Sequence, residues 1–282
     1  MFSQQSLMMA MDGRQNAPLN YCQKPMARGG EAEAMSWVSA GYLLIRPAPR
    51  PQWPDAAGSV QAALLPQPML SASNCLCSQF PGTYAIDWCG DTEAERERAF
   101  DAIALDSNSR AMARTWATEQ FGQVYGWPGV FYDLENAIAA KQKFFPNDSN
   151  LRLIALGLPA EFRETFIAAA TPAPPPAGFA PAGKSGYLET LERNHPVLKG
   201  GVVLGYELLN IDVGQVGCSW LCNGLERHCA KTLGITPNCH GLIDTLPLAQ
   251  ACLTEITKPA VGAEPGLWLP FALVRFSAAT VV

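Results

Sequence analysis

The chain has 282 residues, of which 48% are hydrophobic and 16% are charged, and its formal net charge is −5. That length suffices for one large domain or two ordinary ones with a substantial buried core. The negative charge argues against a general nucleic-acid binder, which carries a basic stripe. No apolar run reaches the roughly 18 to 20 residues of a membrane-spanning helix. The N-terminus lacks the basic leader and apolar core of a secretory signal, so we expect a cytoplasmic protein without membrane contact.

The motifs of common enzyme classes are missing from the sequence. The glycines of GGVVLG precede a strand and are not followed by the Lys-Ser/Thr of a phosphate-binding loop. Neither the zinc-protease pattern HExxH nor the serine-hydrolase pattern GxSxG occurs. We therefore predict that the chain is not an enzyme and uses no cofactor.

The N-terminal part of the chain begins with an unpatterned segment. Residues 1–34 are polar and rich in Gly and Met, which predicts a loose arm. Residues 36–46 (SWVSAGYLLIR) read as a strand that a proline-rich run ends. Residues 60–65 form a short helix or strand, and residues 84–89 alternate like a strand.

Helical spacing of apolar residues begins after this strand. Thr92 and Glu95 have the spacing of a capping box, which predicts a helix that continues to Leu105. Asn108 or Ser109 caps the next helix. The remaining elements predicted before the proline-rich stretch are that helix, ending at Gly122, a helix over 133–144, a strand over 151–156 and a helix over 159–169.

The run TPAPPPAGFAPAG contains five prolines and two glycines in thirteen residues. Such a composition favours an extended connector over a packed element. We therefore predict a linker over 171–184 between an N-terminal α/β lobe (35–170) and a C-terminal α+β lobe (185–282). The fold class is mixed α+β, with a small sheet and packed helices in each lobe.

The C-terminal lobe is predicted to contain five elements. They are a short helix capped by Ser185, a strand over 200–211, a helix over 219–233, a helix over 246–256 and a strand over 269–276.

Four cysteines and two histidines gather in the C-terminal lobe: Cys218, Cys222, His228, Cys229, Cys239 and His240. A zinc site is one interpretation, with Cys218, Cys222, His228 and Cys239 as its ligands. The other is core packing, because residues seven apart share one face of a helix and free thiols pack as small hydrophobes. We favour packing, predict no metal, and expect most of the nine cysteines to be free thiols.

A cysteine nucleophile is an alternative for the same region. GQVGCSW resembles the Gln, Cys and Trp signature of papain-like proteases, although the spacing differs. Only 64 residues follow Cys218, fewer than the histidine and asparagine of that family require. The predicted helix begins next to Cys218, and a helix N-terminus activates a thiol. A cysteine-dependent hydrolase or zinc enzyme centred on Cys218 therefore stays open.

Four stretches of the C-terminal lobe resemble bacterial immunity proteins, which are encoded beside polymorphic or type VI secreted toxins. They are LGYELLNID, CSWLCNGLE, LGITPNCHGLIDTLPLAQA and AEPGLWLPFALVRF, all within residues 204–276. The resemblance implies that the chain neutralises one cognate antibacterial toxin, encoded next to it, by covering the toxin's active site. An adaptor that loads the toxin for delivery is a further alternative.

The surplus of acids lies in the middle of the chain, where residues 91–170 contain twelve acids and eight bases. An acidic inhibitor binds a cationic toxin, such as a nuclease, faster through electrostatic steering. The alternating charges after Glu93 also suit an ordinary solvated helix. Exposed tryptophans are a second signal, because they are typical of binding hot spots. The candidate toxin-binding residues are Asp91, Glu93, Glu95, Glu97, Asp101, Asp106, Glu189 and Glu192.

Overall fold

The computed structural model describes residues 36–47, 69–73, 107–178, 183–193, 197–212, 215–222 and 224–277. All of them belong to one unit of the chain, Met35–Val282. Several predictions lie outside the described residues: the N-terminal arm, the element over 60–65, the strand over 84–89, the helix over 92–105, and the six acids from Asp91 to Asp106.

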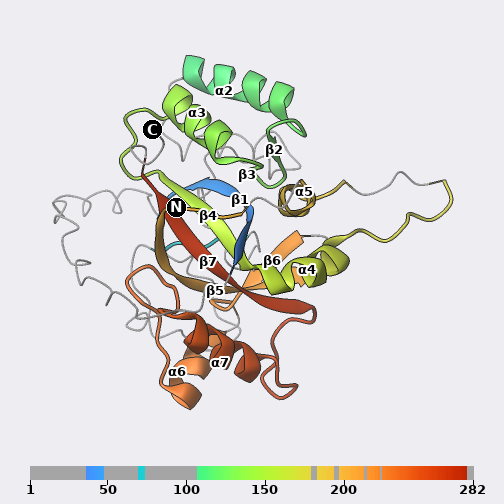
Figure 1. The fold of residues 1–282 in the computed structure, drawn as a ribbon, viewed down its shortest axis with the longest axis vertical. Helices are drawn as coiled ribbons and strands as arrows, with labels where there is room; N and C mark the ends of the chain where they lie inside the picture. The colour runs from blue at the N-terminus through green and yellow to red at the C-terminus, as the bar shows by residue number, and fades with distance from the viewer. Residues whose placement is uncertain are drawn as a thin grey trace, which may run out of the picture. The chain divides into compact units, whose positions relative to one another are not determined.

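Seven described strands form one antiparallel sheet with the order β2-β3-β1-β4-β7-β5-β6 (Figure 1). The central strands are nearly continuous apolar runs because both faces of the sheet are covered. In chain order the strands are β1 (Trp37–Ile45), β2 (Tyr125–Gly126), β3 (Val130–Phe131), β4 (Arg152–Pro159), β5 (Val202–Asp212), β6 (Gln215–Ser219) and β7 (Leu267–Phe276).

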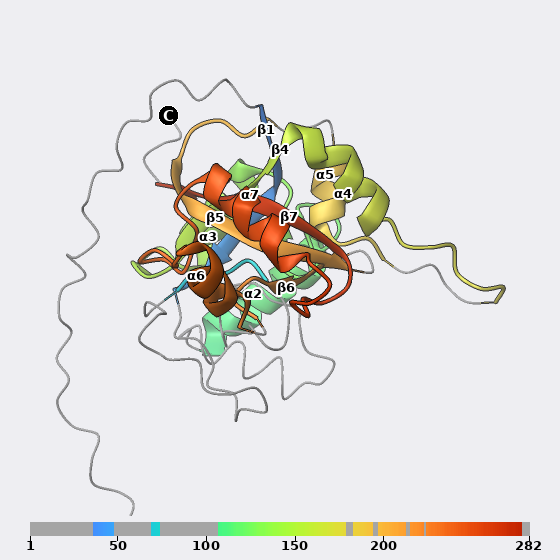
Figure 2. The ribbon, with the colours of Figure 1, turned by 90° about the horizontal axis from the view of Figure 1, so that it is seen from below.

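In the described part of the chain, six α-helices and a short 3-10 helix pack on the two faces of this sheet (Figures 1 and 2). The fold is therefore mixed α+β, as the sequence predicted. The helices are α2 (Ser107–Gln120), α3 (Leu134–Phe144), η2 (Ala160–Phe162), α4 (Arg163–Ala170), α5 (Gly186–Glu192), α6 (Leu225–Leu233) and α7 (Leu246–Ile256).

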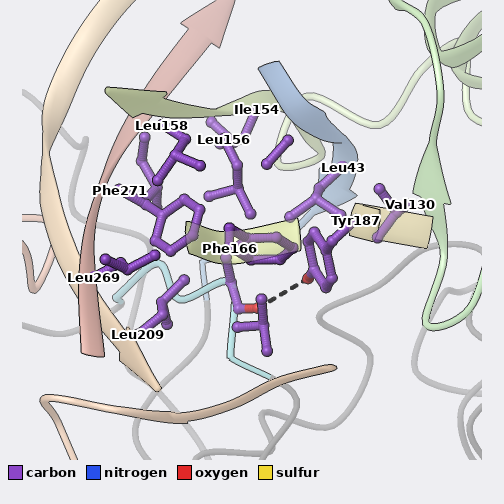
Figure 3. Packing of buried hydrophobic residues seen from close by; sticks show 14 of the residues in the cluster. Leu43, Val130, Ile154, Leu156, Leu158, Phe166, Tyr187, Leu209, Leu269 and Phe271 are labelled. Atoms are coloured by element: carbon purple, nitrogen blue, oxygen red, sulfur yellow. Dashed lines mark hydrogen bonds between the residues drawn. The ribbon is translucent and has the colours of Figure 1, made fainter. Parts of the chain in front are cut away.

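One face of the sheet packs against α4 and α5 (Figure 3). Phe166 of α4 meets Phe271 of β7 edge to face, with ring centroids 6.0 Å apart. Tyr187 of α5 is also fully buried, and its hydroxyl donates a hydrogen bond of 3.1 Å to the carbonyl of Ala72. The segment 69–73 is thereby held inside this core.

The opposite face is covered at two separate places. α2 and α3 cover one end of it, where Trp116 of α2 lies 5.3 Å from the ring of Phe144 of α3. α6 and α7 cover the other end, around the fully buried Trp220 and next to Trp268 of β7. Alternate residues of β7 accordingly point to different helices, as the period of two in a strand requires.

The prediction of two lobes, each with its own sheet, is not confirmed. β4 precedes the proline-rich stretch and β7 follows it, yet the two are neighbours in the sheet and Leu156 pairs with Leu273. The described part of the stretch, 171–178, is mostly exposed. A proline-rich composition excludes helix and central strand, but it does not distinguish a surface loop inside a domain from a linker between domains.

The predicted helix over 219–233 is wrong in its first turns. Gln215–Ser219 is the strand β6, in which Ser219 pairs with Leu209 of β5. α6 begins only at Leu225, after Gly224 with a left-handed φ of 71°. Pairing with β5 supplies hydrogen-bond partners that the local sequence does not indicate. This pairing favours a strand more than the helical spacing of the cysteines favours a helix.

Most other predicted elements are confirmed to within a few residues. Local capping explains the accuracy for α3 and α5. The side chain of Asp133 accepts a hydrogen bond from the backbone N–H of Asn136, and that of Ser185 accepts one from Leu188. These contacts satisfy amide groups that lack partners in the first turn of a helix.

Candidate functional site

The cysteines of the C-terminal cluster are divided among different elements. Cys218 lies on β6 and is half-buried, and Cys222 is buried just after that strand. The backbone N–H of Ser219 donates to the Cys222 sulfur at 3.4 Å. Because Cys218 belongs to a strand, the expectation that a helix N-terminus activates its thiol is wrong.

The other ligands proposed for zinc have partners of their own. His228 lies on α6, and its Nε2 is 2.9 Å from Glu255 Oε1 on α7. Cys239 is disulfide-bonded, so it is not among the free thiols. Within the described ranges, no group of three His, Cys, Asp or Glu side chains is placed to hold a metal ion.

A buried carboxylate is the centre of a hydrogen-bond network that the sequence analysis missed. Glu207 of β5 is fully buried, and its Oε1 accepts hydrogen bonds of 2.6 Å from the hydroxyls of Ser71 and Ser219. Its Oε2 accepts a bond of 2.9 Å from the backbone N–H of Ala72. Burial raises the pKa of Glu207, although these donors oppose the shift. The signal in the sequence was a glutamate inside the apolar strand GYELLN.

The Glu207 network holds the segment 69–73 against the β5–β6 hairpin. Ser73 extends the network, because its hydroxyl donates a hydrogen bond of 2.5 Å to the carbonyl of Gly217 on β6. No part of Glu207 or Ser219 reaches the surface. The network is therefore part of the core of the fold.

A hollow of about 350 Å³ lies on the surface between α2 and α3. We call it the α2–α3 hollow. Trp116, one of its lining residues, is half-buried and stacked on Tyr125 with a centroid distance of 5.9 Å and an interplanar angle of 10°. Met112 is 59% exposed at its side. The lining residues are Ala111, Met112, Thr115, Trp116, Glu119 and Lys143.

The surface that contains this hollow continues to α5. Phe121, directly after α2, is 46% exposed and meets Tyr125 edge to face at 5.6 Å. The guanidinium of Arg193 donates hydrogen bonds of 3.2 Å to the carbonyls of Gly122 and Gln123. It also lies 3.8 Å from the centre of the Tyr132 ring. Arg193 thus fixes the turn after α2 to the end of α5.

Two of the candidate toxin-binding acids, Glu189 and Glu192, lie on this α5 helix. Glu189 accepts a hydrogen bond of 3.1 Å from Arg193, and Glu192 accepts one of 2.6 Å from Lys184. Each charge is therefore largely compensated by a neighbour. The apolar residues Met112 and Phe121, which the sequence analysis did not single out as a surface, are the more prominent feature here.

Comparison with known proteins yields no relative. No family model, no curated protein and no solved structure matches the chain. Among the helices that the structure describes, none has the length and apolar character needed to cross a membrane.

Proposed function

We propose that the chain is an immunity protein that neutralises a cognate secreted antibacterial toxin, such as one delivered by type VI secretion. It does so by covering the active site of the toxin and needs no chemical reaction of its own. The C-terminal stretches that resemble immunity proteins suggest this function. The α2–α3 hollow, together with the exposed end of α2, supplies the surface.

The observation that carries the proposal is the exposure of two large apolar side chains beside a tryptophan. Met112, on the same helix as Trp116, is 59% exposed, and Phe121, directly after that helix, is 46% exposed. The charged residues Glu119 and Lys143 also line the hollow. An apolar and aromatic centre with a charged rim is the composition of binding hot spots in protein interfaces.

The acids of α5 play a smaller part in this proposal. Exposed ion pairs such as Glu189–Arg193 contribute only about 0 to 1 kcal/mol. Rim charges act mainly on the association rate and its salt dependence. A cationic toxin remains the partner that suits a chain with a net charge of −5.

Co-expression with the protein encoded beside this chain tests the proposal. We expect the chain to restore growth to cells that produce that toxin and to copurify with its isolated toxic domain. An adaptor for toxin loading would instead bind the delivery region and leave growth arrested. If the chain binds neither part and growth stays arrested, the proposed function is wrong.

A further inference from the structure

Two buried thiols lie on α6 and α7, in the core around Trp220. Cys229 of α6 and Cys252 of α7 are both 0% exposed, and both are free thiols. Both belong to the same buried core cluster, and the two side chains are close enough for each thiol to shift the pKa of the other. Figures 1 and 2 both show α6 and α7 side by side.

The neighbouring residues fix the register of the two helices at this point. His228 precedes Cys229, and Glu255 lies one turn beyond Cys252. The 2.9 Å contact between His228 Nε2 and Glu255 Oε1 joins α6 to α7 at residues near the two cysteines in the chain. Leu225 and Ile256 belong to the same core cluster. The contact between the thiols therefore belongs to a packed interface.

We propose that Cys229 and Cys252 are a disulfide-forming pair that locks α6 to α7 when the chain meets a disulfide oxidant such as oxidised glutathione. The thiolate of Cys252 attacks one sulfur of the oxidant, forms a mixed disulfide and releases one thiolate of the oxidant. The thiolate of Cys229 then attacks the Cys252 sulfur and releases the second. The pair loses two protons and two electrons, and the oxidant becomes two thiols.

Local electrostatics favour this order of attack. The hydrogen bond between the thiols raises the pKa of Cys229, with burial adding to the rise. The same hydrogen bond lowers the pKa of Cys252, because it stabilises the thiolate that accepts it. Burial of both sulfurs shields them in the folded chain, so the exchange is fast during folding and slow afterwards. Because Cys239 is also disulfide-bonded, its oxidation in the same sample shows that the conditions allow disulfides to form.

Peptide mapping after refolding tests the proposal on the full chain. The unfolded, reduced chain is refolded with reduced and oxidised glutathione, alkylated in denaturant, and cut with trypsin and an endoproteinase that cleaves before Asp. This digestion places Cys229 on 228–231, Cys239 on 232–243 and Cys252 on 244–275, since the Lys258–Pro259 bond resists trypsin. We expect peptide 228–231 joined to peptide 244–275. A reduced sample yields the two peptides separately, each alkylated.

Variants identify the cross-link as specific. Cys252→Ala removes the joined peptide and leaves Cys229 alkylated or bound to glutathione. Cys222→Ala, which removes another buried thiol, leaves the joined peptide in place. Oxidation is also expected to raise the Tm of the wild-type chain and of Cys222→Ala by more than that of Cys252→Ala, which can still form the disulfide at Cys239. The proposal is overturned if wild-type Cys229 and Cys252 both stay alkylated, or pair with other cysteines, while Cys239 is oxidised.

Discussion

Glu207 accepts three hydrogen bonds inside the core of the described part of the chain. Three donors from two distant parts of the chain meet its carboxylate: the hydroxyls of Ser71 and Ser219 and the N–H of Ala72. An ionisable group without water is tolerated inside a protein only when its hydrogen-bonding atoms are satisfied. Glu207 therefore ties the segment 69–73 to the sheet.

Replacing this carboxylate tests its role. Glu207→Gln places an N–H group among donors, so at least one buried partner loses its acceptor. We expect the free energy of unfolding, measured with urea, to fall by about 1 to 3 kcal/mol. The exposed Glu161→Gln is the control and should change little. If Glu207→Gln had the same free energy of unfolding as the wild type, the network would make no net contribution to stability.

Asp148 makes a contribution to the stability of the fold that depends on pH in a definite direction. Burial alone raises its pKa, but the hydrogen bond and charge of Arg46, with the N–H groups of Asn150 and Leu151, outweigh burial and lower it overall. Asp148 therefore stabilises the fold above its unfolded-state pKa, near 3.8, and this contribution disappears as the pH falls through the lower folded-state value.

Asp148→Asn should accordingly reduce the free energy of unfolding most at neutral pH. The difference from wild type should shrink as the pH falls below about 4. Urea unfolding between neutral and acid pH measures this, with the exposed Asp244→Asn as control. A difference that grows toward acid pH would contradict the assignment.

At the scale of elements, Gly205 lets a loop cover an edge of β5. The backbones of Tyr206 and Ile243 exchange hydrogen bonds of 2.7 and 2.8 Å. The φ of Gly205 is +146°, and a Cβ added there would lie 2.7 Å from Leu242 Cβ and 2.9 Å from the oxygen of Ile243. Only glycine permits both this conformation and this close approach.

Gly205→Ala should therefore destabilise the chain strongly. Strain and overpacking together predict a loss of about 2 to 4 kcal/mol. Gly234 is the matched control, since its φ is +70° but a Cβ there meets nothing within 4 Å. Gly234→Ala should lose only about 1 kcal/mol, from the left-handed backbone alone. Equal losses in urea unfolding would show that the close approach at Gly205 is unimportant.

Elements with local signals were predictable, and those that depend on distant pairing were not. The starts of α3 and α5, at Asp133 and Ser185, could be predicted because each side chain accepts a hydrogen bond from a backbone N–H of the helix's own first turn. β6 was missed, and its last residue, Ser219, was placed in a helix, because pairing with β5 is what makes this segment a strand. The role of the acids of α5 in toxin binding stays a prediction. The exposure of Met112 and Phe121 was not predicted, since apolar residues at helical spacing look the same on either face.

At the scale of the whole molecule, the sheet joins parts of the chain on both sides of the proline-rich stretch. β7 lies between β4 and β5, so separating the two halves would expose the apolar faces of central strands. Composition could indicate where the chain avoids regular structure. It could not indicate that β4 and β7 pair, because that contact forms between residues more than 100 positions apart.

Fragments test this topology directly. We expect fragments 35–178 and 185–282, expressed separately, to lack a cooperative urea transition. The intact chain should unfold in one cooperative transition. The first fragment contains β4 without its neighbour β7, and the second contains β7 without its neighbour β4. Circular dichroism follows the transition. Cooperative unfolding of either fragment alone would favour two independent lobes.

The affinity of the chain for its neighbour-encoded toxin tests the central claim most directly. Isothermal titration of the toxic domain compares wild type with Met112→Asp at the α2–α3 hollow and with Leu233→Asp on α6, where Leu233 is 39% exposed. Loss of a hot-spot residue costs about 2 kcal/mol or more, so Met112→Asp should raise Kd about 30-fold. Leu233→Asp should leave Kd unchanged. Wild-type affinity in Met112→Asp, with weakened binding in Leu233→Asp, would contradict this account.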